Sequence, residues 1–401
     1  MSAFADAVAR AHADGRLVVQ PRMGMASPVE MRGGLLAVRG ARATTVGTLT
    51  VDSYTRVGDH QAASAALRDG ARLNGYPIVS HDPVVTRGVL DGLDGFPVQV
   101  RHGSADPRAI FGALAAAGLD ATEGGPVSYC LPYSRRPLRD SVAHWSEACE
   151  GFTGHLETFG GCMMGQLCPP SLLVAISVLE AVFFRCHGVR SVSLSYAQQT
   201  NADQDAEAVH ALRALAARFL SDVDWHVVVY TYMGVFPRTR SGARLLNDNA
   251  ARLAVRAGAQ RLIVKTVAEA HRIPTVAENV DALESAAAAA ASVSYEEPFQ
   301  DNGVLAEATA LVEAVLELPG DPGTAMLAAF RRGLLDVPYC LHPDNAGQAR
   351  SHIDDTGRLR WSSVGAMPIA PTSVDRSTPA DSAGLLAALN RVAHLHDTRP
   401  W

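Results

Sequence analysis

The sequence contains almost no lysine. Of its 35 lysine and arginine residues, only Lys265 is a lysine. A compact, rotatable ammonium in a chain that otherwise uses planar guanidinium groups indicates a site that needs an ammonium. The alternative is chance within a general bias toward arginine. The formal net charge of −6 provides no basic surface for nucleic acid, so we expect no nucleic acid partner.

Other absences exclude further classes of protein. No apolar run is long enough to cross a membrane, and residues 1–15 have no signal-peptide core, so we expect a cytoplasmic protein and no membrane partner. The six cysteines form no Cys-x-x-Cys pair, which argues against a zinc site and against a disulfide framework. The histidines show no metal-ligand spacing, and no serine or cysteine nucleophile system is recognisable.

What the sequence does have is an alternation of short β-branched runs and helical patterns. We expect strands within 16–22, 47–56, 76–81, 96–103, 120–125, 191–196, 226–232 and 261–266. Alternating strands and helices favour an α/β fold with a parallel sheet, and eight such units favour a closed (β/α)8 TIM barrel. An open doubly wound sheet is the alternative, although no Gly-x-Gly-x-x-Gly turn follows the first run. The stretch after the fifth run should hold two helices, around 136–150 and 171–186, joined by a Gly/Met/Cys/Pro loop.

The chain divides into a barrel and an extension. We place the catalytic barrel in residues 1–318 and a C-terminal helix and loop extension in residues 319–401, because proline and glycine become frequent there. The tail after residue 370 should be mobile. Its Ser/Thr/Pro-rich stretch at 371–382 predicts a linker, followed by a short terminal helix.

Charged residues stand at the ends of the predicted strands. In a (β/α)8 barrel the catalytic groups gather at the carboxyl ends of the strands, which here brings together Arg22, Arg56, Arg101, Glu123 and Lys265. Three arginines in one barrel mouth would repel one another unless anions were bound between them. Because each guanidinium can hold a carboxylate or phosphate through two parallel hydrogen bonds, we expect a small substrate with two or more carboxylates.

The same residues allow a second interpretation, in which each arginine makes a local ion pair. Asp52 and Asp106 are the nearby candidates. Glu123 is a lone carboxylate facing the cationic pocket, suited to bind an ammonium or to move a proton. The glycines at 124 and 125 allow a close backbone approach or a positive φ angle. These patterns predict a barrel enzyme that acts on a small dicarboxylate, and they leave the reaction open.

Several short strings at these strand ends carry a family resemblance. They are VQPR (19–22), TVDSYTR (50–56), RHG (101–103), EGG (123–125), SY (128–129), PY (132–133), MG with FP (233–237), VKT (264–266) with Glu269, IPT (273–275), and DVP (336–338) with NAG (345–347). In this order, over residues 16–368, they resemble the large (epsilon) subunit of glutamate mutase. The resemblance is specific because it joins many separate strand ends.

The resemblance implies a (β/α)8 barrel that works with adenosylcobalamin. Such an enzyme interconverts L-glutamate and 3-methylaspartate by a radical rearrangement of the carbon skeleton, in which the protein orients the substrate and excludes water. The implied catalytic residues are Arg101, Glu123 and Lys265. The implied substrate-binding residues are Arg22, Arg56, Arg101, His102, Glu123, Tyr129 and Tyr133. The implied cofactor-binding residues are Gly24, Asn74, Pro132, Phe236, Lys265, Glu269 and Ile273, and no metal ligand is implied in this chain.

The sequence departs from the family pattern in two loops. Residues 160–168 read GGCMMGQLC, where the family has a Gly-Pro-Leu-Thr-Gly-type loop. Residues 196–201 read YAQQTN, where the family has YGQCGN. These differences leave the exact substrate open between glutamate and a close analogue.

The chain also lacks the Asp-x-His-x-x-Gly string with which the family ligates cobalt. The resemblance therefore implies a separate small cobalamin-binding subunit, in a hetero-oligomer where two copies of this chain pair. Two other functions stay open: a cobalamin-independent TIM-barrel isomerase or lyase acting on a small dicarboxylate, and a non-catalytic dicarboxylate-binding subunit. Lys265, Glu269 and Asn74 favour the mutase, because these residues have no evident task without an adenosyl cofactor.

Overall fold

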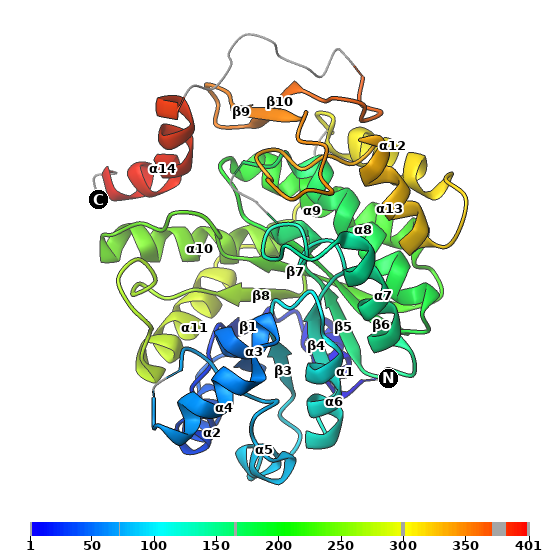
Figure 1. The fold of residues 1–401 in the computed structure, drawn as a ribbon. Helices are drawn as coiled ribbons and strands as arrows, with labels where there is room; N and C mark the ends of the chain where they lie inside the picture. The colour runs from blue at the N-terminus through cyan, green and yellow to red at the C-terminus, as the bar shows by residue number, and fades with distance from the viewer. Residues whose placement is uncertain (1, 72, 164–166, 298–300, 371–381, 399–401) are drawn as a thin grey trace.

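Eight parallel strands form the centre of the molecule (Figure 1). The computed structural model describes residues 2–71, 73–163, 167–297, 301–370 and 382–398. The strands lie in the order β1-β8-β7-β6-β5-β4-β3-β2, and a parallel bridge between Val19 and Thr45 joins the two edges. The predicted (β/α)8 TIM barrel is therefore confirmed. The strands are β1 Val18–Pro21, β2 Gly47–Thr50, β3 Val98–Arg101, β4 Ala121–Gly124, β5 His155–Thr158, β6 Ser191–Ala197, β7 Asp224–Tyr230 and β8 Arg261–Val264.

Helices surround the barrel and close its amino end. They are α1 Ala3–Ala13, α2 Pro28–Arg39, α3 Ser53–Val57, α4 His60–Arg68, α5 Pro83–Val89, α6 Arg108–Ala117, α7 Leu138–Cys149, α8 Pro170–Cys186, α9 Ala202–Phe219, α10 Arg240–Arg256, α11 Val276–Ala290, α12 Val304–Leu316, α13 Pro322–Arg332 and α14 Ser382–Thr398, with a 3-10 helix η1 at Gly160–Cys162. Phe4 and Val8 of α1 cluster with Val18, Val46 and Ala121, which lie at the start of three strands. This apolar cluster seals the barrel at the end opposite to the strand ends.

The prediction of a strand at 76–81 was wrong. Tyr76 makes only an isolated bridge, and the chain then turns. The amides of Ser80 and His81 both donate to the carbonyl oxygen of Pro77, at 2.9 and 3.1 Å. Since proline has no N–H to give to a sheet ladder, the apolar residues of this segment form a buried turn beside β2.

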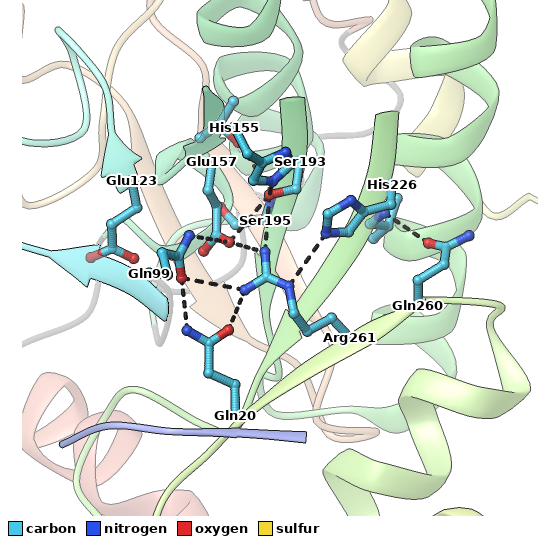
Figure 2. A network of polar contacts seen from close by, with 12 residues as sticks. Gln20, Gln99, Glu123, His155, Glu157, Ser193, Ser195, His226, Gln260 and Arg261 are labelled. Atoms are coloured by element: carbon cyan, nitrogen blue, oxygen red, sulfur yellow. Dashed lines mark hydrogen bonds and ion pairs between the residues drawn. The ribbon is translucent and has the colours of Figure 1, made fainter. Parts of the chain in front are cut away.

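The eighth strand of the barrel is instead β5, which lies in the stretch expected to be helices and a loop. His155 and Glu157 of β5 are fully buried, and they face the barrel interior, where they join a polar network (Figure 2). A strand that turns polar side chains inward has no apolar run, so a search for β-branched residues misses it.

The two helices expected after the fifth predicted strand are present as α7 and α8. All residues of α8 from Pro170 to Phe184 are buried, because α9, α12 and α13 pack on its outer side. A helix covered on all sides is apolar around most of its circumference, and the charged exception among the buried residues of α8 is Glu180. Its start is set by Pro169 and Pro170, since proline is tolerated in the first helical turn.

The region after residue 318 contains α13, an antiparallel hairpin and α14. The hairpin pairs β9, Arg350–Ile353, with β10, Leu359–Ser363, and α14 lies beside α10 (Figure 1). The predicted linker at 371–382 falls outside the described residues, except for Ser382, which begins α14. The division at residue 318 stays a prediction. Within the described part of the chain, no helix has the length and apolar character needed to span a membrane.

Candidate active site

The predicted substrate-binding residues lie together at the carboxyl end of the barrel. A cavity of about 200 Å³ is present there. It is lined by all the residues that the resemblance implies for the substrate, and by four more: Arg22, Arg56, Arg101, His102, Glu123, Tyr129 and Tyr133, with Thr50, Gly103, Phe159 and Met233. A larger cavity of about 750 Å³ shares Arg56, Gly103, Tyr129 and Tyr133 with the small one, so the two cavities adjoin.

Arg101 and Glu123 form a buried ion pair in the wall of this cavity. They come from neighbouring strands, β3 and β4, and their side chains are only 5% and 2% exposed. Arg101 Nε donates to Glu123 Oε2 at 2.7 Å, and the hydroxyl of Tyr129 donates to Glu123 Oε1. Burial and the charge of Glu123 raise the pKa of the Tyr129 phenol well above its usual range. Tyr129 therefore stays protonated and can donate to the carboxylate.

Arg22 and Lys265 share one carboxylate on the β1–β8 side of the mouth. Arg22 Nη1 lies 3.2 Å, and Lys265 Nζ 3.0 Å, from Glu269 Oε1. Lys265 Nζ also lies 5.0 Å from the ring centroid of Phe236. Burial, together with the charge of Arg22, lowers the pKa of Lys265 to about 8. The single lysine of the sequence is thus a buried ammonium whose charge is lost in mildly alkaline solution.

The alternative of local ion pairs is wrong: Arg101 and Arg22 are paired, but not with nearby acidic residues. Their partners are glutamates from distant parts of the sequence. Asp52 instead caps α3, accepting from the amides of Tyr54 and Thr55 at 2.9 and 3.1 Å. Asp106 binds Arg108 at 2.8 Å. The sequence distance between partners hides such pairs from a local search.

Arg56 has a different position from the expected one. The strand predicted at 47–56 ends at Thr50, and Arg56 lies in the last turn of the short helix α3. Its Nε is buried and has no hydrogen-bond partner among the described residues. The Arg56 side chain packs against Gly103, which has φ +80°. A Cβ at position 103 would lie 3.1 Å from Arg56 Cδ, so the missing side chain makes room for Arg56. An unpaired buried guanidinium N–H facing a cavity is ready for an anion.

His102 presents a second buried donor. Its Nδ1 accepts from the amide of Ser104 at 3.0 Å. Burial and the charge of Arg56 lower the pKa of His102 to about 3, so the ring is neutral and its proton lies on Nε2. That Nε2 is buried and makes no hydrogen bond of good geometry in the part of the chain that the structure describes, although the backbone carbonyl of Glu123 interacts with the ring. A ligand acceptor would satisfy it.

The glycines after Glu123 are required by packing. Gly124 has φ +135°, and a Cβ on Gly125 would lie 2.0 Å from Glu180 Oε1. Glu180, on α8, accepts from the amides of Val127 and Ser128 at 3.2 and 2.9 Å. The buried carboxylate thus fixes the loop that carries Tyr129. The positive φ of Gly124 and the close approach at Gly125 are the two features that the double glycine allows.

The remaining predicted cofactor residues lie on loops that follow the strands. Gly24 follows β1, and a Cβ there would lie 2.3 Å from the carbonyl oxygen of Thr50. Pro132 follows β4 and is partly buried, whereas Asn74 and Ile273 are exposed. The loops of Gly24 and Asn74 approach the end of β2, since the amides of Thr50 and Tyr76 bond to the carbonyls of Met23 and Thr50 respectively.

Residues that sequence analysis missed lie below the cavity, inside the barrel. Figure 2 shows Arg261 surrounded by Gln20, Gln99 and Ser193, with Glu157 beside it. Arg261 and Glu157 form a fully buried ion pair. Inward-facing residues in a barrel come from alternate positions of alternate strands, so strict strand periodicity was the signal that could have identified them. In the described residues, no group of three or more His, Cys, Asp or Glu side chains is arranged to hold a metal ion.

Comparison with known proteins identifies relatives over nearly the whole chain. Residues 1–378 match the family model of the methylaspartate mutase E chain. The glutamate mutase epsilon subunit of Halobacterium salinarum is 34% identical over 342 residues, which cover 80% of this chain and 71% of that protein. The epsilon subunit of Escherichia coli O157:H7 is 29% identical over 399 residues, covering 93% and 82% respectively. Among solved structures, tryptophan synthase from M. tuberculosis aligns with a TM-score of 0.41 at 16% identity, over 72% of this chain and 100% of that chain.

Proposed function

The chain belongs to the methylaspartate mutase E chain family and is an isomerase of the mutase type, and from this premise we propose that it is the catalytic subunit of an adenosylcobalamin-dependent carbon-skeleton mutase. Its reaction would interconvert L-glutamate, or a close analogue, and 3-methylaspartate by a radical mechanism. When bound, adenosylcobalamin supplies the carbon radical that takes a hydrogen atom from the substrate. The residues of this chain bind the substrate, orient it and keep water away.

One observation carries the proposal: three guanidinium groups and one carboxylate line the same cavity of about 200 Å³. A cavity of this size suits a small molecule. Its cations are matched by two carboxylates on the ligand, and Glu123 is matched by an ammonium. Arg56 holds a buried N–H without a partner in the described chain, and the buried Nε2–H of His102 makes no hydrogen bond of good geometry there. An amino dicarboxylate would satisfy both groups.

The orientation of the substrate follows from which groups are already rigid. Arg101 and Glu123 are held by strands β3 and β4 and by the bonds between them. We assign the carboxylates of the substrate to Arg56, Arg101 and Arg22, and its amino group to Glu123. A radical reaction needs a substrate held in one fixed orientation, because the radical must take hydrogen from one carbon and no other.

The residues on the other side of the mouth fit an adenosyl group. Lys265 and Glu269 offer an N–H donor and a carboxylate acceptor 3.0 Å apart. The two hydroxyl groups of a ribose can accept from the first and donate to the second. Ile273, on the loop that follows β8, provides exposed apolar surface, whereas Phe236, on the loop that follows β7, is buried beside Lys265. We assign Lys265 and Glu269 to the ribose, and Gly24, Asn74, Pro132, Phe236 and Ile273 to the corrin side.

The proposal includes a partner. No Asp-x-His-x-x-Gly string is present in the chain, so the cobalt ligand would come from a small cobalamin-binding subunit at the barrel mouth. We further propose that two copies of this chain pair within the hetero-oligomer. The six cysteines are all free thiols, which supports a reducing compartment, and we propose the cytoplasm.

The test is reconstitution. The full chain is mixed with a small subunit of the Asp-x-His-x-x-Gly type, adenosylcobalamin and L-glutamate, and 3-methylaspartate is followed by NMR. We expect product only when all components are present. Product without a corrinoid would favour the cobalamin-independent isomerase or lyase. No product with any related dicarboxylate, although cobalamin binds, would leave a non-catalytic binding subunit.

A matched pair of variants tests the arginine grip. Arg56→Lys keeps the charge but removes the buried Nε–H, so we expect KM for the dicarboxylate to rise about tenfold, the equivalent of one hydrogen bond to a charged group. Arg68→Lys, on the exposed face of α4, is the control and should leave KM unchanged. An equal effect of the two substitutions would contradict the assignment of Arg56.

A further inference from the structure

Beneath the substrate cavity lies a second buried ion pair with its own supply of hydrogen-bond donors. Arg261 binds Glu157, and both side chains are fully buried. Gln99 Nε2 and Ser193 Oγ also donate to Glu157 Oε2, at 3.1 and 3.2 Å. Figure 2 shows Arg261, Glu157, Gln99 and Ser193 in one group, with Glu123 to one side of it. Glu157 thus has at least three donors before any contact with the site above it.

Tyr230, the last residue of β7, joins this lower pair to the site. Its hydroxyl is within hydrogen-bond distance of Glu123 Oε2, at 2.8 Å, and of Glu157 Oε1. Arg101 Nη2 donates to the same hydroxyl oxygen at 3.4 Å. Tyr230 is fully buried and is not among the residues that line the substrate cavity. It therefore lies behind the Arg101–Glu123 pair.

A phenol carries one proton, so Tyr230 can donate to only one of the two carboxylates at a time. Burial of the ring, with the nearby carboxylates, raises the pKa of Tyr230 well above its usual range, and the proton stays on the phenol. Among the described residues, and leaving Tyr230 out, Glu157 accepts from three donors, all on Oε2: Arg261, Gln99 and Ser193. Glu123 accepts from two, Arg101 Nε on Oε2 and the Tyr129 hydroxyl on Oε1. The carboxylate with fewer donors gains more from the proton.

We propose that Tyr230 is a positioning residue, which holds the carboxylate of Glu123 in the orientation that receives the amino group of the substrate. The bonds close a ring: Arg101 Nε and the Tyr230 hydroxyl both donate to Glu123 Oε2, and Arg101 Nη2 donates to Tyr230. With Oε2 held inside this ring and Oε1 bound by Tyr129, both oxygens of the carboxylate are restrained. The Glu157–Arg261 pair supports Tyr230 from below.

This inference rests on the proposed function only for the class of substrate, so its test measures binding and not turnover. Tyr230→Phe keeps the ring and removes the hydroxyl. The matched control is Tyr232→Phe, because Tyr232 is also fully buried and its hydroxyl has no partner among the described residues. Affinities are measured by calorimetry on the full chain, alone and with the small subunit and hydroxocobalamin, which has no adenosyl group and allows no turnover.

The comparison of two ligands separates positioning from general damage. Glutarate has the two carboxylates of glutamate but no amino group. We expect Tyr230→Phe to weaken glutamate binding about tenfold, the worth of a hydrogen bond to a charged group, and glutarate binding less than threefold. Ser193→Ala removes one hydrogen-bond donor from Glu157 and makes no change at Tyr230. The Tyr230 hydroxyl should then donate to Glu157 more often, and to Glu123 less often. This second variant should weaken glutamate binding about twofold and leave glutarate unchanged.

Each outcome decides the matter. Equal losses for the two ligands would show a merely structural role for Tyr230, and no loss for either would show no role, so both results overturn the inference. A selective loss for glutamate supports it, and does so even if reconstitution yields no mutase product. If the unaltered chain binds neither glutamate nor 3-methylaspartate, the proposed substrate class fails and the inference falls with it.

Discussion

Replacing Glu123 by glutamine removes one charge from a buried ion pair and changes one hydrogen-bond acceptor, a carboxylate oxygen, into an NH₂ donor. The carboxylate accepts from Tyr129 on Oε1, and from Arg101 and Tyr230 on Oε2. A glutamine amide has one oxygen and one NH₂ group. Whichever way the amide is turned, the NH₂ group meets at least one donor. Arg101, which is 5% exposed, also loses its countercharge.

These changes set the size of the effect. Breaking a buried ion pair by removal of one partner costs about 3–5 kcal/mol, because an uncompensated charge stays buried. We therefore expect Glu123→Gln to lower the free energy of unfolding by about 3 kcal/mol. Urea unfolding followed by tryptophan fluorescence measures the change, and Trp145, which stacks on His102 at 5.7 Å between centroids, reports on this region.

The control is the same substitution in an exposed pair. Arg108 Nη1 lies 2.8 Å from Glu147 Oε2, and the two side chains are 44% and 56% exposed. Water screens such a pair, so Glu147→Gln should cost less than about 1 kcal/mol. If the losses for Glu123→Gln and Glu147→Gln agree within about 1 kcal/mol, the reasoning from burial is refuted.

Two further substitutions follow from single contacts. Gly125→Ala places a Cβ 2.0 Å from Glu180 Oε1 and should lower the free energy of unfolding by about 2 kcal/mol. Gly112 is exposed on α6 with open space around it, so Gly112→Ala should stabilise the protein by about 0.5 kcal/mol. Urea unfolding measures both variants. A free energy of unfolding that is higher for Gly125→Ala than for Gly112→Ala would be inconsistent with this packing. Burial holds the pKa of Lys265 at about 8, so its ammonium is present below that pH and is lost as the pH rises through it. Adenosylcobalamin affinity, measured by absorbance titration from pH 7 to pH 9.5, should therefore fall above about pH 8, whereas Lys265→Arg should bind with no such fall; the same alkaline fall in both proteins would count against Lys265.

The parts of the fold predicted correctly are those with a local signal. β6 alternates serine with apolar residues, β7 carries a run of three valines, and α8 is mostly apolar, so their patterns identify them. The misses occurred where the barrel interior reverses the usual pattern. β5 carries His155 and Glu157 inward, while the apolar segment at 76–81 forms a turn because Pro77 cannot donate to a ladder. In β5 the side chains that face the barrel interior decided the pattern, whereas at 76–81 a proline did.

The candidate site shows the same division. Arg101 and Glu123 could be selected from sequence because polar residues at the ends of predicted strands converge in a barrel. Their mutual ion pair could not, since either residue could have faced a nearer partner. Tyr230 could not be selected from sequence for another reason: an aromatic residue at the end of a β-branched strand is interpreted as a core residue. Only its position between two carboxylates, seen in the structure, suggests a functional role.

The sequence by itself determined that a parallel barrel would form and that several cations and Glu123 would meet at one end of it. Strand periodicity is local, and the carboxyl ends of parallel strands meet wherever the barrel closes. Only the tertiary structure decided which charges neutralise one another. Glu269 pairs with both Arg22 and Lys265, Arg101 pairs with Glu123, and Arg56 keeps an N–H that has no partner among the described residues. Pairing depends on distances of about 3 Å between side chains from different strands, and local sequence patterns do not encode such distances.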